Sequence, residues 1–98
     1  MIYVLATIVA QPGKAAELIK GARACIDATR RETGCLTYNY VQDTDRPNTV
    51  LVVERWTTRE ALTAHLLAPH LAQWREQRKP LVQTTKVEII HPAQIETL

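Results

Sequence analysis

The sequence lacks the features by which most cofactor-binding proteins are recognised. Its 98 residues include three glycines and two cysteines. They contain no glycine-rich phosphate loop, no CxxCH haem-attachment motif and no flavin or nicotinamide fingerprint. We therefore expect no bound cofactor. If the protein carries out an oxidation, its substrate must supply the electrons, because nothing else in the chain can.

A secretory leader and a cysteine framework are also missing. Cys25 and Cys35 lack CxxC spacing, and the apolar first ten residues have no basic lead-in before Pro12-Gly13. We interpret this start as a strand and a turn, and neither as a signal peptide nor as a membrane span. The two thiols should then be reduced, which favours a cytoplasmic protein.

Long runs of one charge are absent. The net charge is +2, acidic and basic residues alternate along the chain, and the basic pairs Arg30-Arg31 and Arg78-Lys79 are short. A nucleic-acid-binding domain would carry a basic stripe, so we expect no nucleic-acid partner. We interpret both pairs as solvated helix ends, where cations offset the partial negative charge of the helix C-terminus.

Hydrophobic periodicity predicts the first half of the fold. Residues 2–10 form a β-branched run that suits a strand buried on both faces. Residues 14–33 follow a helical period, because Leu18, Ala22, Cys25 and Thr29 recur at spacings of four and three. Gly34 comes next. It is placed to end the helix in a left-handed conformation, which glycine adopts at little cost.

The second half predicts a hairpin, a broken helix and a last strand. Residues 36–42 and 50–56 are strand-like runs on either side of a polar loop. Thr57 and Glu60 have the spacing of a capping box and predict the next helix start. Pro69 interrupts that helix, a second helical stretch ends near Pro80, and the final strand is centred on residues 87–90.

This order of elements predicts a single α+β domain over residues 1–98. Strand, helix, strand, strand, helix, strand is the ferredoxin-like arrangement, an antiparallel sheet with helices on one face. The chain is too short to cover the other face, and small domains gain from burial against a partner. We therefore expect a homodimer in which the bare faces of two sheets pack into a barrel.

Several short motifs, in their order and spacing, resemble the antibiotic-biosynthesis-monooxygenase family. They are Thr33 to Tyr38, Asp43, Pro47, Glu54-Arg55-Trp56, Glu60 to His65 and Pro69-His70. The resemblance implies the dimeric α+β barrel fold. Members include cofactor-free oxygenases of quinol-like or polyketide aromatics, haem-degrading enzymes and small proteins that handle signalling or stress metabolites, so the fold alone leaves the reaction open.

This chain departs from two patterns of that family. Its haem-degrading members use an Asn on the first strand, whereas this chain has Leu5-Ala6-Thr7-Ile8 there. Its polyketide oxygenases carry an Asn four residues before the strand tryptophan, where this chain has Val52. Both departures argue against haem degradation and against carrying over the polyketide mechanism in full.

Histidine and aromatic side chains are the candidate catalytic groups. His65 follows Leu62 on the apolar face of its helix and should point toward the sheet, and His70 lies five residues later. They lack the i, i+4 spacing and the carboxylate partner of a metal site, so we expect no metal. Trp56 offers a flat wall with one hydrogen-bond donor, and Tyr38 offers a phenol. Whether Tyr38 and Trp56 share a face depends on the hairpin register, which the sequence leaves open.

Other residues are expected to bind the substrate. Glu54 shares a face with Trp56. If buried, it must be paired with an arginine as a structural group or have a raised pKa as a base. Leu62 should line the same pocket, and Trp74, on a helical stripe with Leu67, Leu71 and Arg78, should close the pocket rim or the core.

These residues suggest a cofactor-independent monooxygenase. His65 would take a proton from a small electron-rich aromatic, His70 or Tyr38 would hold the resulting anion, and Trp56 would stack on the ring. The anion could then pass an electron to dioxygen. The alternatives are a dimeric protein that binds or isomerises a small carbonyl metabolite without oxygen, and a purely structural dimer in which His65 is a packed core residue.

Overall fold

A computed structural model describes all 98 residues of the chain. Four strands, four helices and one short 3-10 turn follow one another in the order β1 (Ile2–Ala10), α1 (Ala15–Gly21), α2 (Arg23–Arg30), β2 (Cys35–Gln42), β3 (Thr49–Trp56), α3 (Arg59–Leu66), α4 (Pro69–Arg78), η1 (Lys79–Leu81) and β4 (Val82–Ile90). This is the ferredoxin-like α+β fold that the order of elements predicts.

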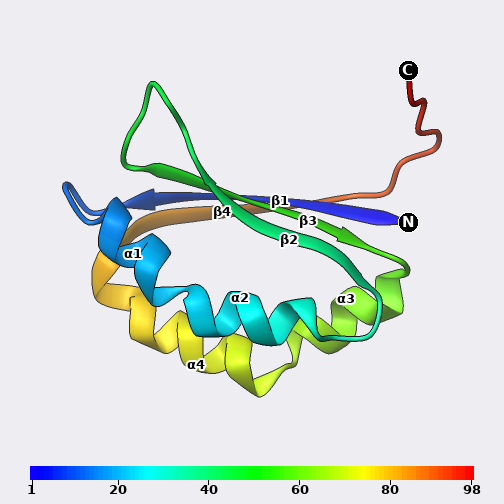
Figure 1. Cartoon of the computed structure of the whole chain (residues 1–98), viewed down its shortest axis with the longest axis horizontal. Coiled ribbons are helices and arrows are strands. Elements are labelled where there is room, and N and C mark those ends of the chain that lie inside the picture. Colours follow the sequence, from blue (N-terminus) through cyan, green and yellow to red (C-terminus); the bar gives the residue numbers. More distant parts are fainter.

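The four strands form one antiparallel sheet in the order β2-β3-β1-β4. All four helices lie on one side of this sheet, and the opposite face is bare (Figure 1). β1 pairs with β3 from Ile2↔Trp56 to Val9↔Thr49 and with β4 on its other edge. The N-terminal strand therefore runs through the middle of the sheet, and β2 and β4 are the two edges.

The first helical stretch is divided, where the sequence predicted one helix. α1 ends at Gly21, and α2 starts after Ala22. The predicted apolar stripe is confirmed across the break, since Leu18, Ala22, Cys25 and Thr29 are all at most 4% exposed. α2 ends at Arg30, so Gly34 is not the helix stop. It has φ +84° in the turn that leads into β2, which confirms the left-handed conformation but not its place.

The next helix begins one residue later than predicted. Thr58 is the cap of α3, and its hydroxyl accepts a hydrogen bond from the backbone N–H of Ala61. The backbone N–H of Thr57 instead donates to the carbonyl of Gly34. Thr57 therefore ties the end of β3 to the start of β2, and the predicted capping pair of Thr57 and Glu60 is wrong by one position.

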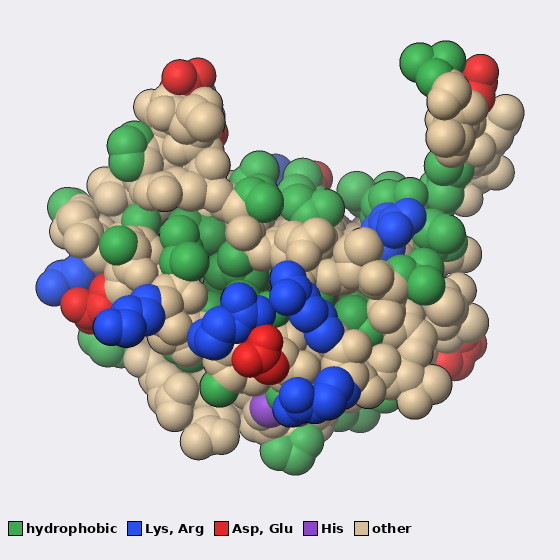
Figure 2. Space-filling view, viewed as in Figure 1, with side chains coloured by type: hydrophobic (Ala, Val, Ile, Leu, Met, Phe, Trp, Pro, Cys, Tyr) green, Lys and Arg blue, Asp and Glu red, His purple; other side chains and the backbone are tan.

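The core lies between the sheet and the helices. Alternate residues of β1 from Ile2 to Ala10 are buried there, and those in between are half-exposed. The expectation that β1 is buried on both faces is therefore wrong for a single chain. The half-exposed side chains lie on the bare face. Hydrophobic side chains are visible there along the top of the molecule, between two projecting segments (Figure 2). None of the helices combines the length and the apolar character that crossing a membrane requires.

Candidate functional site

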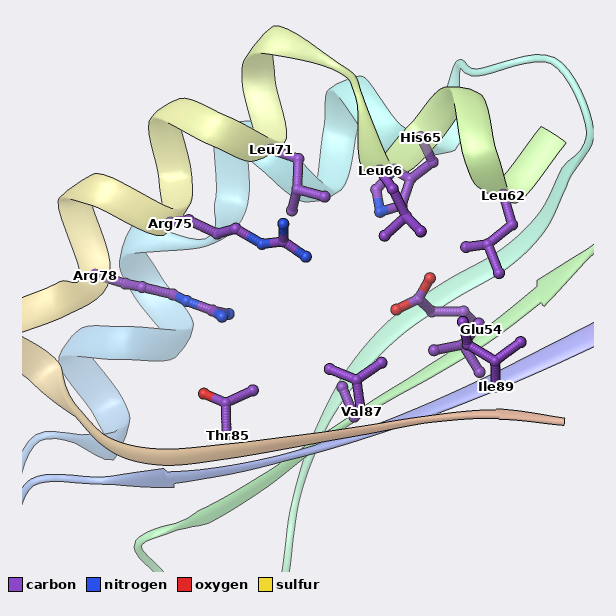
Figure 3. A pocket seen from close by; sticks show the side chains of 12 residues that line it. Glu54, Leu62, His65, Leu66, Leu71, Arg75, Arg78, Thr85, Val87 and Ile89 are labelled. Atoms are coloured by element: carbon purple, nitrogen blue, oxygen red, sulfur yellow. The ribbon is translucent and has the colours of Figure 1, made fainter. Parts of the chain in front are cut away.

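A pocket opens between α3 and α4 on one side and the sheet on the other (Figure 3). The space between its walls, together with the solvent-filled mouth, amounts to about 460 Å³. The lining residues are Val4, Ala6, Glu54, Leu62, His65, Leu66, Leu71, Arg75, Arg78, Thr85, Val87 and Ile89. The pocket exists because helices pack against β1, β2 and β3, whereas no helix covers edge strand β4 to the same extent. Its walls are mostly apolar with a few converging polar groups, as in small-molecule sites.

Glu54 is the buried carboxyl group of this pocket. Its place in β3 turns its side chain toward the helices, and it is 6% exposed. Burial raises its pKa to about 7, although the indole N–H of Trp56, which donates to Oε1 at 3.0 Å, opposes this rise. No arginine lies within ion-pair distance of Glu54. The structural alternative of a Glu54–Arg pair is therefore wrong within this chain, and a protonatable carboxyl faces the pocket.

His65 is the second titratable group on the pocket wall. Its side chain is 2% exposed, and its Nδ1 lies 2.7 Å from Oε2 of Glu32. The same carboxylate oxygen lies 2.9 Å from Nε2 of His70. A carboxylate accepts, so Nδ1–H of His65 and Nε2–H of His70 both donate to it. One carboxylate thus orients two imidazoles.

This arrangement fixes how His65 presents its ring. With the proton held on Nδ1 by Glu32, Nε2 carries the lone pair. No enclosed side-chain nitrogen or oxygen lacks a hydrogen-bond partner, and Nε2 has none in the protein, so it reaches accessible space. Burial lowers the pKa of His65, against the opposing effect of Glu32. His65 is therefore a neutral imidazole near pH 7, able to accept a proton.

Glu32, His65 and His70 also form the cluster of side chains that most resembles a metal site. Two histidines and a carboxylate are common ligands of zinc and iron, and the three donor atoms lie within 4.8 Å of one another. The carboxylate partner that the sequence analysis found missing is thus present, so that reason for excluding a metal is wrong. At 2.7 and 2.9 Å, however, the carboxylate oxygen is already hydrogen-bonded to both nitrogens, and an ion would have to displace both bonds.

The structure brings most of the predicted aromatic residues together, but behind the pocket. Tyr38 pairs with Glu54, so Tyr38 and Trp56 share a face. The His65 ring lies 4.8 Å from that of Trp56 and 5.4 Å from that of Tyr38, measured between centroids. Trp56 is fully buried and Tyr38 is 3% exposed, and neither lines the pocket. Neither can therefore stack on or hold a ligand there. Both instead support His65 and Glu54 from behind.

His70 and Trp74 lie on the other side of α4. Both line a second hollow between α4 and the α1–α2 pair. The indole N–H of Trp74 donates to the hydroxyl of Tyr40 at 3.1 Å, so Trp74 closes the core as expected. Leu67 is 79% exposed and does not belong to the Trp74 stripe. His70 thus connects to the pocket only through Glu32 and His65, and it does not face a ligand bound beside Glu54.

Comparison with known proteins places the chain in a family. The family model for antibiotic biosynthesis monooxygenase matches residues 1–77. The chain belongs to this family. The matched stretch runs from β1 through most of α4 and so includes both Glu54 and His65.

Proteins similar to this one in sequence and structure come from several bacteria. An uncharacterized protein of Synechocystis, sll1783, is 30% identical over 99% of this chain and 67% of its own length. A Deinococcus radiodurans structure, described as a candidate antibiotic biosynthesis monooxygenase, has a TM-score of 0.91 at 28% identity and covers 100% of this chain and 98% of its own. PA3566 of Pseudomonas aeruginosa has a TM-score of 0.85 at 29% identity, covering 95% and 94%.

Three residues at or beside the pocket of this family member were given no role in the site from the sequence: Glu32, Arg75 and Arg78. Glu32 follows the Arg30-Arg31 pair in the sequence, and the fold places it beside the end of α3 and the start of α4, where His65 and His70 lie. Arg75 lies four residues after Leu71, and Arg78 lies three residues after Arg75, which places all three on one helix face. That spacing was the available signal. Arg78 is the last residue of α4, which confirms the predicted helix end, but it is half-buried on the pocket wall and not fully solvated as predicted.

Proposed function

We propose that this protein is a cofactor-independent oxygenase that acts on a small hydroxylated aromatic compound such as a quinol. The observation that carries the proposal is the pair of titratable groups that face one pocket, His65 from α3 and Glu54 from β3. Burial lowers the pKa of His65 and raises that of Glu54 to about 7. When the surroundings lower the pKa of a histidine and raise the pKa of a carboxyl group, the histidine can act as the base and the carboxyl group as the acid.

In the first step, Nε2 of His65 accepts the phenolic proton. Glu32 stabilises the imidazolium through Nδ1–H, as the third member of a catalytic triad does. The substrate anion then gives one electron to dioxygen, and the substrate radical and superoxide combine at a ring carbon that carries hydrogen. The peroxide anion that forms takes the proton back from Nε2 of His65, which gives a hydroperoxide and returns His65 to its neutral form.

In the second step, the O–O bond breaks. Nε2 of His65 takes the proton from the ring carbon, which becomes a carbonyl; one oxygen atom stays on the substrate, and the other leaves as water. Glu54, when protonated, supplies a proton to the departing oxygen. Overall, the substrate gives up two hydrogens and gains one oxygen. Leu62, Leu66 and Leu71 provide the apolar wall that limits water around the anion.

Paired aerobic and anaerobic incubations with a panel of hydroquinones test this proposal. We expect oxygen uptake equal to product formed, with one atom of ¹⁸O₂ in the product. His65→Gln should abolish most of the turnover, whereas His91→Gln, a change of an exposed histidine outside the site, should leave it unchanged. Turnover that continues at the same rate without oxygen would overturn the oxygenase.

A second candidate function is proton transfer on a small carbonyl metabolite. It is favoured by the same acid–base pair, which needs no oxygen for isomerisation, and by the two arginines that face the pocket. An isomerase would exchange a substrate C–H for deuterium in D₂O under anaerobic conditions. An oxygenase would show exchange only at the acidic O–H, so NMR of the recovered ligand separates the two.

We also propose that the bare face of the sheet binds a second copy of this chain. Tyr3, Leu5 and Val9 are half-exposed there. The β2–β3 loop and the segment after β4 project beyond that face (Figure 1). Light scattering at micromolar concentration should give a dimer, and Leu5→Glu should shift it toward monomer. A wild-type monomer with an intact fold would overturn the proposal. Cytoplasmic location and the lack of nucleic-acid or membrane partners stay predictions.

A further inference from the structure

Two arginine side chains extend from α4 into the pocket. Arg75 and Arg78 lie one turn apart on the same face of the helix and point toward the strands, with Thr85 of β4 opposite Arg78 (Figure 3). Glu54 lies farther along the same space, under α3. The pocket therefore has a cationic end near α4 and an acid–base end near His65.

Neither guanidinium has a carboxylate partner. None of the ion pairs in the protein includes Arg75 or Arg78, and neither side chain donates a hydrogen bond to another residue. In contrast, Arg23 pairs with Asp27, and Arg30 donates to the carbonyl of Tyr38 and to Asn39. The donors of Arg75 and Arg78 are free to bind a ligand, and Arg78 is already half-buried on the pocket wall.

The chemistry of these donors specifies the group that they would bind. A guanidinium presents a planar fork of N–H donors that matches the oxygen atoms of a carboxylate or a phosphate. Two such forks one helical turn apart, with a hydroxyl on the facing strand, form a clamp for an oxyanion. Glu54 does not occupy this clamp: it forms no ion pair with either arginine, although the charge of Arg75 acts on it, and its Oε1 accepts the indole N–H of Trp56.

We propose that the substrate carries an oxyanion, a carboxylate or a phosphate, which Arg75 and Arg78 bind while the reacting end lies against His65 and Glu54. The assignment of the reacting end rests on the proposed function, whereas the anion clamp does not. The clamp also gives the ligand one orientation in the pocket, since an anion would be repelled from the ionised form of Glu54 and attracted to the arginines.

Anaerobic equilibrium binding of matched ligands tests the clamp without turnover. The first arm compares 2,5-dihydroxybenzoate with its methyl ester, which differ in the carboxylate. The second arm compares 4-hydroxyphenyl phosphate with hydroquinone, which differ in the phosphate. We expect at least one acid to bind about 10- to 100-fold more tightly than its neutral counterpart. The arm with the larger ratio identifies the kind of oxyanion.

The arginine variants connect this preference to the clamp. Arg75→Gln and Arg78→Gln should each reduce the ratio of acid to neutral affinity, and the double variant should bring this ratio near one. Arg23→Gln removes the same guanidinium from an exposed site on α2 and should leave the ratio as in wild type. Melting temperatures confirm that each variant is folded.

Three results would overturn the proposal: equal binding of acid and neutral counterpart in both arms, no binding of either acid, or a preference that survives in the double variant. Failure of the oxygenase would look different. Arginine-dependent binding without oxygen uptake removes the oxygenase and keeps the clamp, whereas oxygen-dependent turnover of neutral quinols with no preference for acids removes the clamp and keeps the oxygenase.

Discussion

The two edge strands of the sheet, β2 and β4, have opposite surroundings. Both lie at the margin of the same sheet, but α2 packs against β2, and no helix covers β4 to the same extent. As a result Tyr38 of β2 is 3% exposed, whereas Val87 and Ile89 on the helix-facing side of β4 are 49% and 38% exposed. We call the part of the core between the helices and strands β1, β2 and β3 the closed half, and the part beside β4 the open half.

This difference shows how a small domain can hold both a rigid core and a site. The helices are placed toward β2, which seals the closed half and leaves a pocket in the open half. Trp56 and Tyr38 belong to the closed half and support Glu54 and His65, which lie at the boundary between the two. The reactive groups are therefore fixed from one side and accessible from the other.

Gly34 offers the strongest test of how tightly the closed half is packed. A Cβ at this position would lie 2.6 Å from Cβ of Ala61 and 2.7 Å from Oγ1 of Thr57, and its φ is +84°. Gly34→Ala should therefore destabilise the protein by about 2–5 kcal/mol, combining backbone strain with overpacking. Chemical denaturation gives the free energy of unfolding.

Gly13→Ala is the matched control for Gly34. Gly13 also has a positive φ, +76°, but nothing lies within 4 Å of the position that its Cβ would take. Only the cost of the left-handed backbone conformation remains, so we expect the free energy of unfolding to fall by about 1–2 kcal/mol. If both substitutions cost the same, the contact between β2 and the start of α3 is looser than the structure shows.

His65→Gln tests whether the boundary between the halves is catalytic or structural. The substituted amide preserves a hydrogen-bonding group near Glu32, so folding should stay nearly intact. Activity should fall by about 10²-fold or more, the usual contribution of a positioned acid–base group. Glu32→Gln should give a smaller loss and shift the pH profile of kcat, because it acts through His65 and does not face the pocket.

The opposite result would show that His65 is a structural residue of the packed core. A structural His65 would lower stability by about 1–3 kcal/mol when replaced, because buried partners lose their hydrogen bonds. Affinity per folded molecule would then stay as in wild type. Measuring melting temperature and ligand affinity on one sample separates the two cases, and lost stability with unchanged affinity would remove the catalytic role.

Much of the fold was predictable because local patterns determine it. The stripe of Leu18, Ala22, Cys25 and Thr29 identified the buried helix face, and the order of elements identified the sheet. Helix boundaries were less accurate. Thr57 and Thr58 are both suitable caps, and the tertiary hydrogen bond from Thr57 to Gly34 decides between them. Such a contact joins distant residues and leaves no mark in local sequence.

The site was predictable only in part, for the same reason. His65, Glu54 and Leu62 could be placed on a pocket from their own periodicity, since each lies on the inner face of one element. Glu32 could not, because its partners are 33 and 38 residues away in the sequence. The register that joins Tyr38 to Glu54 depends on the hairpin turn and on an irregularity between Cys35 and Thr37, which alternation alone does not reveal.

Matched valine substitutions test the two halves directly. Val50 lies in the closed half and is fully buried, and Val87 lies in the open half at 49% exposure. Val50→Ala should cost about 2 kcal/mol, from the lost apolar burial and the cavity that remains, and Val87→Ala less than about 0.5 kcal/mol. Similar losses at both positions would mean that β4 is covered in solution, for example by a partner, and the open half would need another description.

The smallest effect concerns the pH dependence of stability and reports how dry the open half is. The pKa of Glu54 is raised from 4.5 to about 7, so the unfolded chain ionises this group before the folded chain does. Wild-type stability relative to Glu54→Gln should therefore be constant below the unfolded pKa and decrease as the pH rises from there through about 7. Above that pH the variant should have gained about 1–2 kcal/mol on wild type relative to acidic solution, less than the full shift implies, because water enters the pocket.

The glutamine introduced by this substitution keeps an oxygen acceptor for the indole of Trp56, so the comparison isolates the charge. The neighbouring charged groups, Glu32, His65, Arg75 and Arg78, are present in both proteins and largely cancel in the difference. Urea denaturation of the two proteins between about pH 4 and pH 9, a range that spans both ionisations, gives this difference directly. A difference that stays flat across the range would show that Glu54 ionises as it does in water, and the acid role assigned to it would fail.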